Sequence, residues 1–248
     1  RRQRVDLNLI VDMNPCSFLQ KGGAEQFVGQ IEKIDAINLF LSSLIDVDTT
    51  LWKYPIPSWI KDEMDSPVTP RQHIEGKVNA VCQKMRNVLL DAEKDGVTCK
   101  GKIVTEGHYL LPILSTFAKE NPPKLEEALS LIKYHASSDS SKTQMLYKSK
   151  KFDEAIAYLA FLADYELIFN TAVGMYDFDL AKAVARHSQM DPKVYLPLLK
   201  HWRELPKAIA RYEVDVKLKR YESALRHLVA SSEEETPDES YFDDCLKF

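Results

Sequence analysis

Apolar positions recur at helical spacing along most of the chain, and residues 174–199 show this pattern most clearly. The first half of this stretch carries an apolar stripe, and Asp191 and Pro192 then open a second apolar segment. Asp191 suits a helix N-cap, and Pro192 suits the first turn, where its missing N–H is not needed. Neither short helix can bury its stripe alone, so the pattern predicts a stack of antiparallel helical hairpins. The apolar positions are Phe178, Leu180, Ala181, Val184 and Ala185, then Tyr195, Leu196, Leu198 and Leu199.

Three earlier stretches of the chain are also rich in apolar residues. Residues 27–44 carry apolar side chains at helical spacing without a proline, which predicts one helix with a broad buried face. The pattern returns from residue 74 to residue 92, and Gly96 is placed to end that helix. Residues 103–117 form a third apolar run, which ends before two successive prolines. The chain is therefore predicted to be all-α.

Residues 46–70 are predicted to form an irregular loop rather than a helix. Pro55, Pro57, Pro67 and Pro70 remove backbone donors and fix φ too often for a helix to persist. Long loops of this kind are often functional, and amphipathic aromatic side chains commonly anchor interfaces. Two interpretations are open: the loop binds a partner, or its rings fold back onto neighbouring helices. The candidate partner-binding residues are Trp52, Tyr54 and Trp59.

Four segments share one local formula: an apolar or aromatic residue, an acid, a variable residue, and then alanine. An acid near the start of a helix stabilises the positive end of the helix dipole. The alanine lets a neighbouring helix approach closely, and the first residue fills the gap between adjacent hairpins. The segments begin at Leu125, Phe152, Phe178 and Tyr221 and contain Ala128, Ala155, Ala181 and Ala224.

This formula resembles the second helix of a tetratricopeptide repeat. The starts are 27, 26 and 43 positions apart, whereas a regular repeat would recur about every 34 residues. The prediction is one irregular α-solenoid segment of tetratricopeptide-like hairpins spanning residues 1–248. An ordinary helical bundle, in which the matches arise by chance, is the alternative.

Polar and charged stretches divide this array. Residues 136–143 are small and polar, which indicates a flexible linker or an ordering gap. Residues 207–226 carry six basic and three acidic side chains, a local excess of +3. Residues 233–244 then hold seven acids and no base, so an acidic loop is expected over 231–244. The basic stretch is either a contact surface for RNA or an acidic partner, through Lys217, Lys219 and Arg220, or a solvated helix face.

The sequence contains no recognisable catalytic or cofactor constellation. Six histidines are dispersed without a His-Glu-x-x-His pair, and the four cysteines have no Cys-x-x-Cys spacing. Gly-rich phosphate loops and Gly-x-Ser-x-Gly elbows are absent from the sequence. These patterns predict a protein that is not an enzyme and that has no catalytic, metal-binding or cofactor-binding residues.

Composition bears on the size of the core, the kind of partner and the cellular compartment. The 248 residues are 45% hydrophobic and 28% charged, enough to bury a sizeable core, and the net charge is −4. That charge argues against a surface generally adapted to nucleic acid. No apolar run is long enough to cross a bilayer, and the cysteine pattern favours a reducing compartment, cytosolic or nuclear. A chain that begins at Arg1 rather than Met is expected to be a piece of a longer protein.

The run from Tyr176 to Leu199 resembles the C-terminal half of the largest, scaffolding subunit of the Elongator complex. Three further segments, 6–15, 37–41 and 218–225, are similar to that family and occur in the same order. The resemblance covers residues 5 to 229, without the 46–70 loop or the acidic end.

The resemblance implies a non-catalytic scaffold. Members of the family have two β-propellers before a tetratricopeptide-like helical region, whose later part mediates homodimerisation. Their assembly modifies the wobble uridine of tRNA, and a different subunit houses the radical-SAM and acetyl-CoA chemistry. The implied partners are thus other Elongator subunits, a second scaffold copy, and tRNA in the assembled complex, the last mainly through residues outside this chain. A general tetratricopeptide-type adaptor and direct RNA binding through 207–226 are the alternatives.

Overall fold

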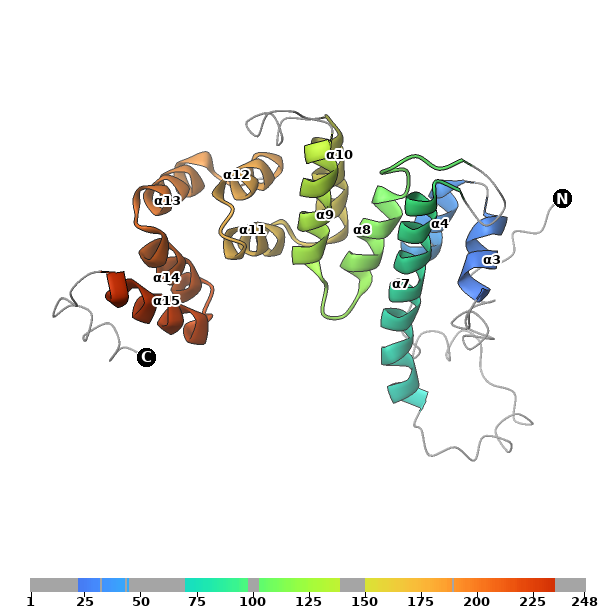
Figure 1. The fold of residues 1–248 in the computed structure, drawn as a ribbon, viewed down its shortest axis with the longest axis horizontal. Coiled ribbons are helices and arrows are strands. Elements are labelled where there is room, and N and C mark those ends of the chain that lie inside the picture. The colour runs from blue at the N-terminus through green and yellow to red at the C-terminus, as the bar shows by residue number, and fades with distance from the viewer. Residues whose placement is uncertain are drawn as a thin grey trace. The chain divides into compact units, whose positions relative to one another are not determined.

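The computed structural model describes residues 22–31, 33–42, 44, 70–97, 103–138, 150–188 and 190–234. In these ranges the fold is helical, apart from one antiparallel bridge between Val97 and Ile103. The chain divides into two compact units, residues 1–128 and 129–248. The helices, coloured by position in Figure 1, are α3 (Gly23–Gln30), α4 (Ile34–Ser42), α7 (Pro70–Asp95), α8 (Leu110–Lys119), α9 (Leu125–Ser138), α10 (Lys150–Leu162), α11 (Tyr165–Gly174), α12 (Phe178–His187), α13 (Pro192–Glu204), α14 (Lys207–Lys217) and α15 (Tyr221–Glu234).

The first unit is built around the long helix α7 and its neighbour α8. Helix α8 packs on both α7 and α4, and α3 packs on α7. Apolar side chains from these helices interlock with no more than 2% exposure, and their burial is the main stabilising term for the unit. They include Phe40, Leu41, Met85, Leu89, Ile113 and Leu114.

The single helix predicted over residues 27–44 is wrong, because the structure has two helices there. Helix α3 ends at Gln30, where Ile31 adopts an extended backbone with φ −85° and ψ 122°. Helix α4 begins at Ile34, with Asp35 in its first turn. No proline lies at this break, although Gly29 in the last turn of α3 lowers the helix propensity there. Tertiary packing accounts for it, since the change of direction lets α3 reach α7 while α4 reaches α8.

The ends of α7 partly agree with the sequence. Gly96 follows the helix directly and has a φ of 67°, so it acts as the left-handed stop that was predicted. Pro70, in contrast, is the first residue of α7 and not part of the loop, because a proline fits the first helical turn. The apolar run from Ile103 also does not begin a helix, which starts only at Leu110.

A buried polar network joins α7 to α8. Arg86 donates through Nε to Thr116 Oγ1 at 3.0 Å and forms an ion pair with Glu120. The guanidinium also lies 3.7 Å from the centroid of the Phe117 ring. Lys124 approaches the second oxygen of Glu120 at 3.3 Å. Arg86 and Glu120 are 8% and 4% exposed, so each charge depends on the other to remain inside the unit.

In the second unit, the tightest pairs are the hairpins α11–α12 and α14–α15, with α13 between them (Figure 1). The caps follow the sequence closely. Asp177 accepts a hydrogen bond from the Leu180 N–H, and Asp191 accepts one from Lys193 ahead of α13. The sequence predicted that α12 and α13 form a hairpin. These two helices do pack together, but α12 packs more extensively on α11.

The two hairpins are built alike. Each connection has three residues between its helices, and the middle one is left-handed: Tyr176 with φ 57° and Lys219 with φ 59°. The helix that follows begins with the shared formula in both cases, and its alanine, Ala181 or Ala224, is completely buried. Ala128 and Ala155 are 0% and 1% exposed, as expected for residues that lie between packed helices.

Two of the predicted polar segments begin inside helices. Ala136 is 2% exposed and lies in α9, which continues to Ser138, so the linker predicted over 136–143 starts inside a helix. Residues 231–234 likewise form the last turn of α15 and not a loop. A small polar composition at a helix end is compatible with the helix continuing while its apolar face stays buried. The rest of both segments lies outside the described residues.

Candidate functional site

The most unusual site in the second unit is centred on Asp215 of α14. Its side chain is completely buried, and its Oδ2 accepts a 2.8 Å hydrogen bond from Tyr176 Oη at the α11–α12 turn. The other oxygen, Oδ1, has no hydrogen-bond partner in the described part of the chain. Oδ2 also lies 3.7 Å from His227 Nε2. A buried acid is costly to isolate, so its bond to Tyr176 fixes α14 to the neighbouring hairpin.

Two more side chains surround Tyr176. His227 of α15 lies 3.2 Å from the tyrosine oxygen through Nε2, and the two rings meet edge to face. The Arg211 guanidinium lies 5.2 Å from the centroid of the same ring. Burial raises the pKa of Tyr176 above its ordinary value, and the hydrogen bond to Asp215 raises it further. Tyr176 therefore acts as a neutral hydrogen-bond donor in this site.

Arg220 makes a second connection between the two hairpins. It occupies the position before α15 that Asp177 occupies before α12, but it cannot cap a helix N-terminus. Its guanidinium instead reaches the Gly174 carbonyl at 3.4 Å. A Cβ on Gly174 would lie 2.7 Å from the Arg220 guanidinium, so glycine makes room for this approach.

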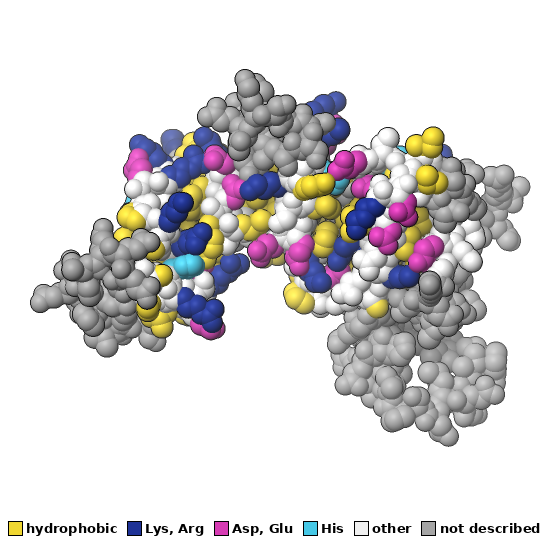
Figure 2. All heavy atoms as spheres, viewed as in Figure 1, with side chains coloured by type: hydrophobic (Ala, Val, Ile, Leu, Met, Phe, Trp, Pro, Cys, Tyr) yellow, Lys and Arg dark blue, Asp and Glu magenta, His cyan; other side chains and the backbone are white. Residues whose placement is uncertain are grey.

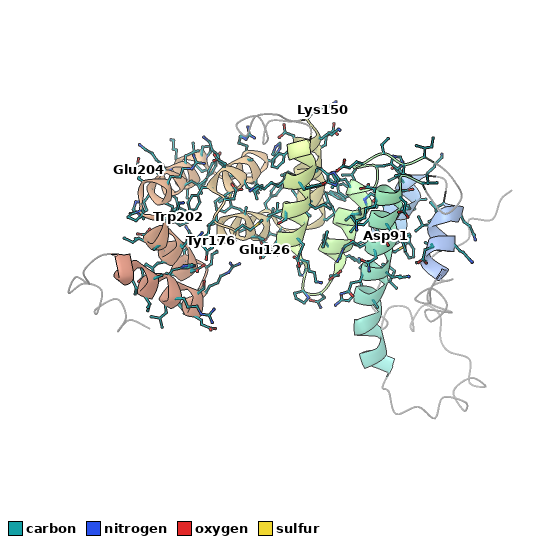
Figure 3. All side chains as sticks on the ribbon, viewed as in Figure 1. Asp91, Glu126, Lys150, Tyr176, Trp202 and Glu204 are labelled. Atoms are coloured by element: carbon teal, nitrogen blue, oxygen red, sulfur yellow. The ribbon has the colours of Figure 1, made fainter. Side chains whose placement is uncertain are left out.

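The junction of α12, α13 and α14 contains a second cluster, centred on Trp202. The Phe178 ring stacks on Trp202 at 5.9 Å, and Trp202 Nε1 donates to Glu213 at 3.1 Å. His201 also contacts Glu213, at 2.9 Å. Tyr176 and Trp202, both labelled in Figure 3, thus mark two of the places where helices of this unit are joined by polar contacts.

A shallow depression of about 630 Å³ lies over the start of α12. Its rim carries two ion pairs, Lys133 with Asp177 and Arg203 with Asp179. Asp177 caps the start of α12, Asp179 lies in its first turn, and each of them pairs with a base from another helix. The lining residues are Lys133, Met175, Tyr176, Asp177, Phe178, Asp179 and Arg203. The alternating charges suit protein contact better than capture of a single anion.

The predicted site residues are only partly described. Trp52, Tyr54 and Trp59 lie outside the described residues. Lys217 ends α14 with its Nζ 5.5 Å from the centroid of the Trp202 ring. Lys219 is exposed in the α14–α15 turn, and Arg220 faces Gly174. Basic and apolar side chains share the visible face of the second unit (Figure 2). The contact of these three residues with RNA or an acidic partner stays a prediction.

The buried contact between Tyr176 and Asp215 was not predicted from the sequence. Tyr176 and Asp215 are 39 positions apart, and no local motif links them. One signal was present: Asp215 interrupts the apolar face of α14 between Val214 and Val216. An acid on a buried helix face needs a donor from elsewhere, and a tyrosine in a tight turn is a suitable one.

The described residues contain no evident catalytic or metal-binding centre. No group of three His, Cys, Asp or Glu side chains within them could hold a metal ion. His187 contacts Asp153 at 2.7 Å and joins α12 to α10. Burial raises the pKa of the Cys82 thiol to about 12, and Glu120 adds to the increase, so this cysteine is inert as a nucleophile. None of the helices in the described ranges is long and apolar enough to cross a membrane.

Stacked hairpins, closely packed alanines and polar contacts between successive hairpins define an α-solenoid. Comparison with known proteins identifies the family. The model of the ELP1 alpha-solenoid matches residues 1–202, and the chain belongs to this family. Over 247 residues it is 34% identical to Elongator complex protein 1 of Rattus norvegicus, covering 99% of this chain and 16% of the relative.

Relatives from other organisms match the chain to a similar degree. Elongator complex protein 1 of Arabidopsis thaliana is 32% identical over 250 residues, covering 99% of this chain and 18% of the relative. The protein of the same name from Saccharomyces cerevisiae is 31% identical over 248 residues, covering 92% of this chain and 16% of the relative. The chain spans less than a fifth of the length of these relatives. The resemblance to the Elongator scaffold family and the prediction of an α-solenoid are both confirmed.

Proposed function

We propose that this chain is a non-catalytic scaffold segment of an Elongator complex. In this role it supports the assembly and dimerisation of a machine that modifies the wobble uridine of tRNA. The observation that carries the proposal is the match of residues 1–202 to the ELP1 alpha-solenoid, a helical region and not a catalytic domain. Stacked helical hairpins are well suited to such a role because they present extended surfaces to several partners.

The partners follow from this proposal. They are the other Elongator subunits, notably the radical-SAM and acetyltransferase subunit, together with a second copy of the full-length scaffold. The compartment is cytosolic, with the nucleus as a second location. The depression over α12, bounded by Lys133, Asp177, Asp179 and Arg203, supplies a polar surface suited to one of these protein contacts.

Co-purification tests the proposal. A tagged 248-residue chain is expected to retain the catalytic subunit and to show no acetyltransferase or tRNA-modifying activity of its own. The matched variant is the double change Lys133→Glu and Arg203→Glu, which reverses the basic half of the depression. Its control is Lys200→Glu, which changes an exposed base outside the depression. Modification of tRNA by the isolated chain, or no retention of any Elongator subunit, would refute the scaffold role.

Direct RNA binding is the second candidate, and the exposure of Lys219 in the α14–α15 turn favours it. RNA binding through this stretch predicts affinity that falls steeply with salt, and a further loss when Lys219 is changed to Glu. Lys219→Glu is the informative variant because Lys217 and Arg220 also contact protein groups. Filter binding at low salt that detects no complex would exclude this function.

A further inference from the structure

Two exposed arginines of the second unit approach the same turn, the one between α11 and α12. The Arg211 guanidinium lies 5.2 Å from the centroid of the Tyr176 ring, which is labelled in Figure 3. Arg220 Nη1 lies 3.4 Å from the carbonyl oxygen of Gly174, two residues earlier in the chain. Both arginines are exposed. They come from α14 and from the α14–α15 connection, so only the fold brings them to this turn.

The arginine pair, Arg211 and Arg220, differs from other arginines of the chain in its partners. Arg86, Arg203 and Arg226 each form an ion pair with an acid. In the part of the chain that the structure describes, neither member of the arginine pair does so. Their charges are therefore not matched by a direct contact with a carboxylate.

The acids that lie closest to the arginine pair in the sequence are engaged elsewhere. Asp215, one helical turn after Arg211, is completely buried and bonded to the tyrosine hydroxyl. Glu213 accepts a hydrogen bond from the indole of α13, and Glu222 forms an ion pair within α15. Both guanidiniums therefore keep hydrogen-bond donors that these acids do not use.

The unused donors are arranged for an anion. A guanidinium carries several N–H groups in a planar fork that matches the oxygens of a phosphate or a carboxylate. Within the described ranges, the Arg220 guanidinium donates only to the Gly174 carbonyl, and that of Arg211 contacts only the Tyr176 ring. A Cβ on Gly174 would lie within 2.9 Å of three guanidinium atoms of Arg220, so the glycine lets this group rest against the turn. A base held in this way loses less freedom when it binds a ligand.

We propose that Arg211 and Arg220 bind the phosphate group of a phosphorylated side chain on a partner protein. Such a group carries about two negative charges at neutral pH, so it matches two converging guanidiniums better than a single carboxylate does. Tyr176 orients Arg211 through the cation–π contact, and Gly174 orients Arg220. Lys219, exposed beside Arg220, adds positive charge at the edge of the site.

A single phosphate group suits this site better than a nucleic acid chain. Nucleic acid presents a line of phosphates, and a protein gains affinity by neutralising many of them together. Here the bases converge on one turn, and Asp177 and Asp179 follow directly at the start of α12. These acids would repel a chain of phosphates that continued along the helix.

The site makes the binding of a partner depend on phosphorylation of that partner. It needs only the second unit of this chain and not an assembled Elongator complex. Failure of the phosphate site would therefore leave the scaffold role untouched, and failure of co-purification would leave the phosphate site untouched.

Nuclear magnetic resonance titration of the full 248-residue chain tests the site. The probe is a synthetic peptide with blocked ends, Gly-Gly-phosphoserine-Gly-Gly. We expect it to shift the Nε–H signals of Arg211 and Arg220 with a dissociation constant of about 1 mM, and to leave the signal of Arg226 in place. The unphosphorylated peptide is expected to cause no shift. A peptide with glutamate in place of phosphoserine is expected to bind at least about fivefold more weakly.

Variants separate the arginine pair from charge in general. Arg211→Gln is expected to weaken binding of the phosphorylated peptide at least about tenfold. Arg220→Lys keeps the charge but loses the planar fork, and it is expected to weaken binding at least about threefold. Arg226→Gln changes an exposed arginine on α15 and is the matched control, with affinity expected to stay within about twofold. Thermal unfolding of each variant separates loss of the site from loss of the fold.

Three results would overturn the proposal. The first is the absence of any shift with the phosphorylated peptide at about 10 mM. The second is equal loss of affinity in Arg226→Gln and Arg211→Gln, or equal binding of the glutamate peptide. The third is an oligouridylate that binds more tightly than the phosphorylated peptide and loses affinity steeply with salt, which would show that the site takes RNA instead.

Discussion

Tyr176 and Asp215 join two helical hairpins through a single 2.8 Å hydrogen bond. The tyrosine lies in the α11–α12 turn, in a left-handed backbone conformation that is unfavourable for a bulky residue. The acid lies on the buried face of α14 and is completely shielded from water. The tyrosine hydroxyl offsets part of the cost of burying the carboxyl group, whose other oxygen has no hydrogen-bond partner in the described residues.

Changing Tyr176 to Phe removes this hydrogen bond and leaves the shape of the ring unchanged. We expect the free energy of unfolding to fall by about 1–3 kcal/mol, since a buried acid loses its donor. Urea unfolding followed by circular dichroism measures the change. Tyr165→Phe removes a hydroxyl from the start of α11 and serves as the control, with little effect expected. Equal stability of Tyr176→Phe and the unmodified chain would show that the bond contributes nothing.

Ala181 tests whether alanine in the shared formula is needed for close packing. Its side chain is completely buried where α12 meets its neighbours. Ala181→Leu is expected to destabilise the chain by about 1–3 kcal/mol through overpacking. The neighbouring Lys182→Leu adds the same side chain at an exposed position and is expected to stay within about 0.5 kcal/mol. Thermal unfolding compares the two, and equal melting temperatures would contradict the packing role.

Arg86 and Glu120 form a buried pair in which removal of one partner is expected to be costly. Arg86→Met leaves Glu120 inside the first unit without its main partner, which we expect to cost about 3–5 kcal/mol. Adding Glu120→Gln to this variant restores part of the loss because the uncompensated charge is gone. A double-mutant cycle by urea unfolding gives the coupling energy.

The exposed pair of Lys94 and Asp91 is the control for that cycle, with a coupling below about 1 kcal/mol. A coupling for Arg86 and Glu120 no larger than that of the exposed pair would refute the structural role of the buried pair.

Cys82 makes stability depend on alkaline pH. Burial first, and then Glu120, raises the pKa of its thiol from 9.0 to about 12. The fold therefore favours the neutral thiol. Its contribution is complete below pH 9 and is lost as the pH rises toward 12. Above pH 9 we expect the unmodified chain to lose up to about 1.4 kcal/mol per pH unit more than Cys82→Ala does.

Urea unfolding between pH 8 and pH 10.5 measures this difference for both proteins. Parallel curves would show that the thiol ionises as easily in the folded chain as in the unfolded one. Thiol labelling of the native protein at pH 8 gives a second measurement, since a thiolate fraction about a thousandfold below that of a free cysteine makes Cys82 slow to react.

Local patterns in the sequence were sufficient to predict most of the helices and the ends of two of them. Asp191 caps α13 and Gly96 ends α7 as expected, because these signals act within one or two turns. The α-solenoid class followed from the same periodicity. These features depend on short-range physics that a single sequence displays.

Features that depend on which helices meet were not predictable in this way. The break between α3 and α4 serves contacts with two different helices, and Gly29 before it is by itself too weak a signal to predict it. The bond between Tyr176 and Asp215 likewise requires knowing that the α11–α12 turn meets α14. The basic stretch is a further case, since only the fold brings the Arg220 guanidinium to the Gly174 carbonyl.

The paired connections between the hairpins also have a mechanical consequence. Tyr176 with Asp215, and Gly174 with Arg220, join α11–α12 directly to α14–α15 without passing through α13. Separating the two hairpins would break both of these hydrogen bonds, so the bonds resist bending between the hairpins. Helix α13 is joined to the same element separately, because Trp202 stacks on Phe178 of α12 and donates to Glu213 of α14.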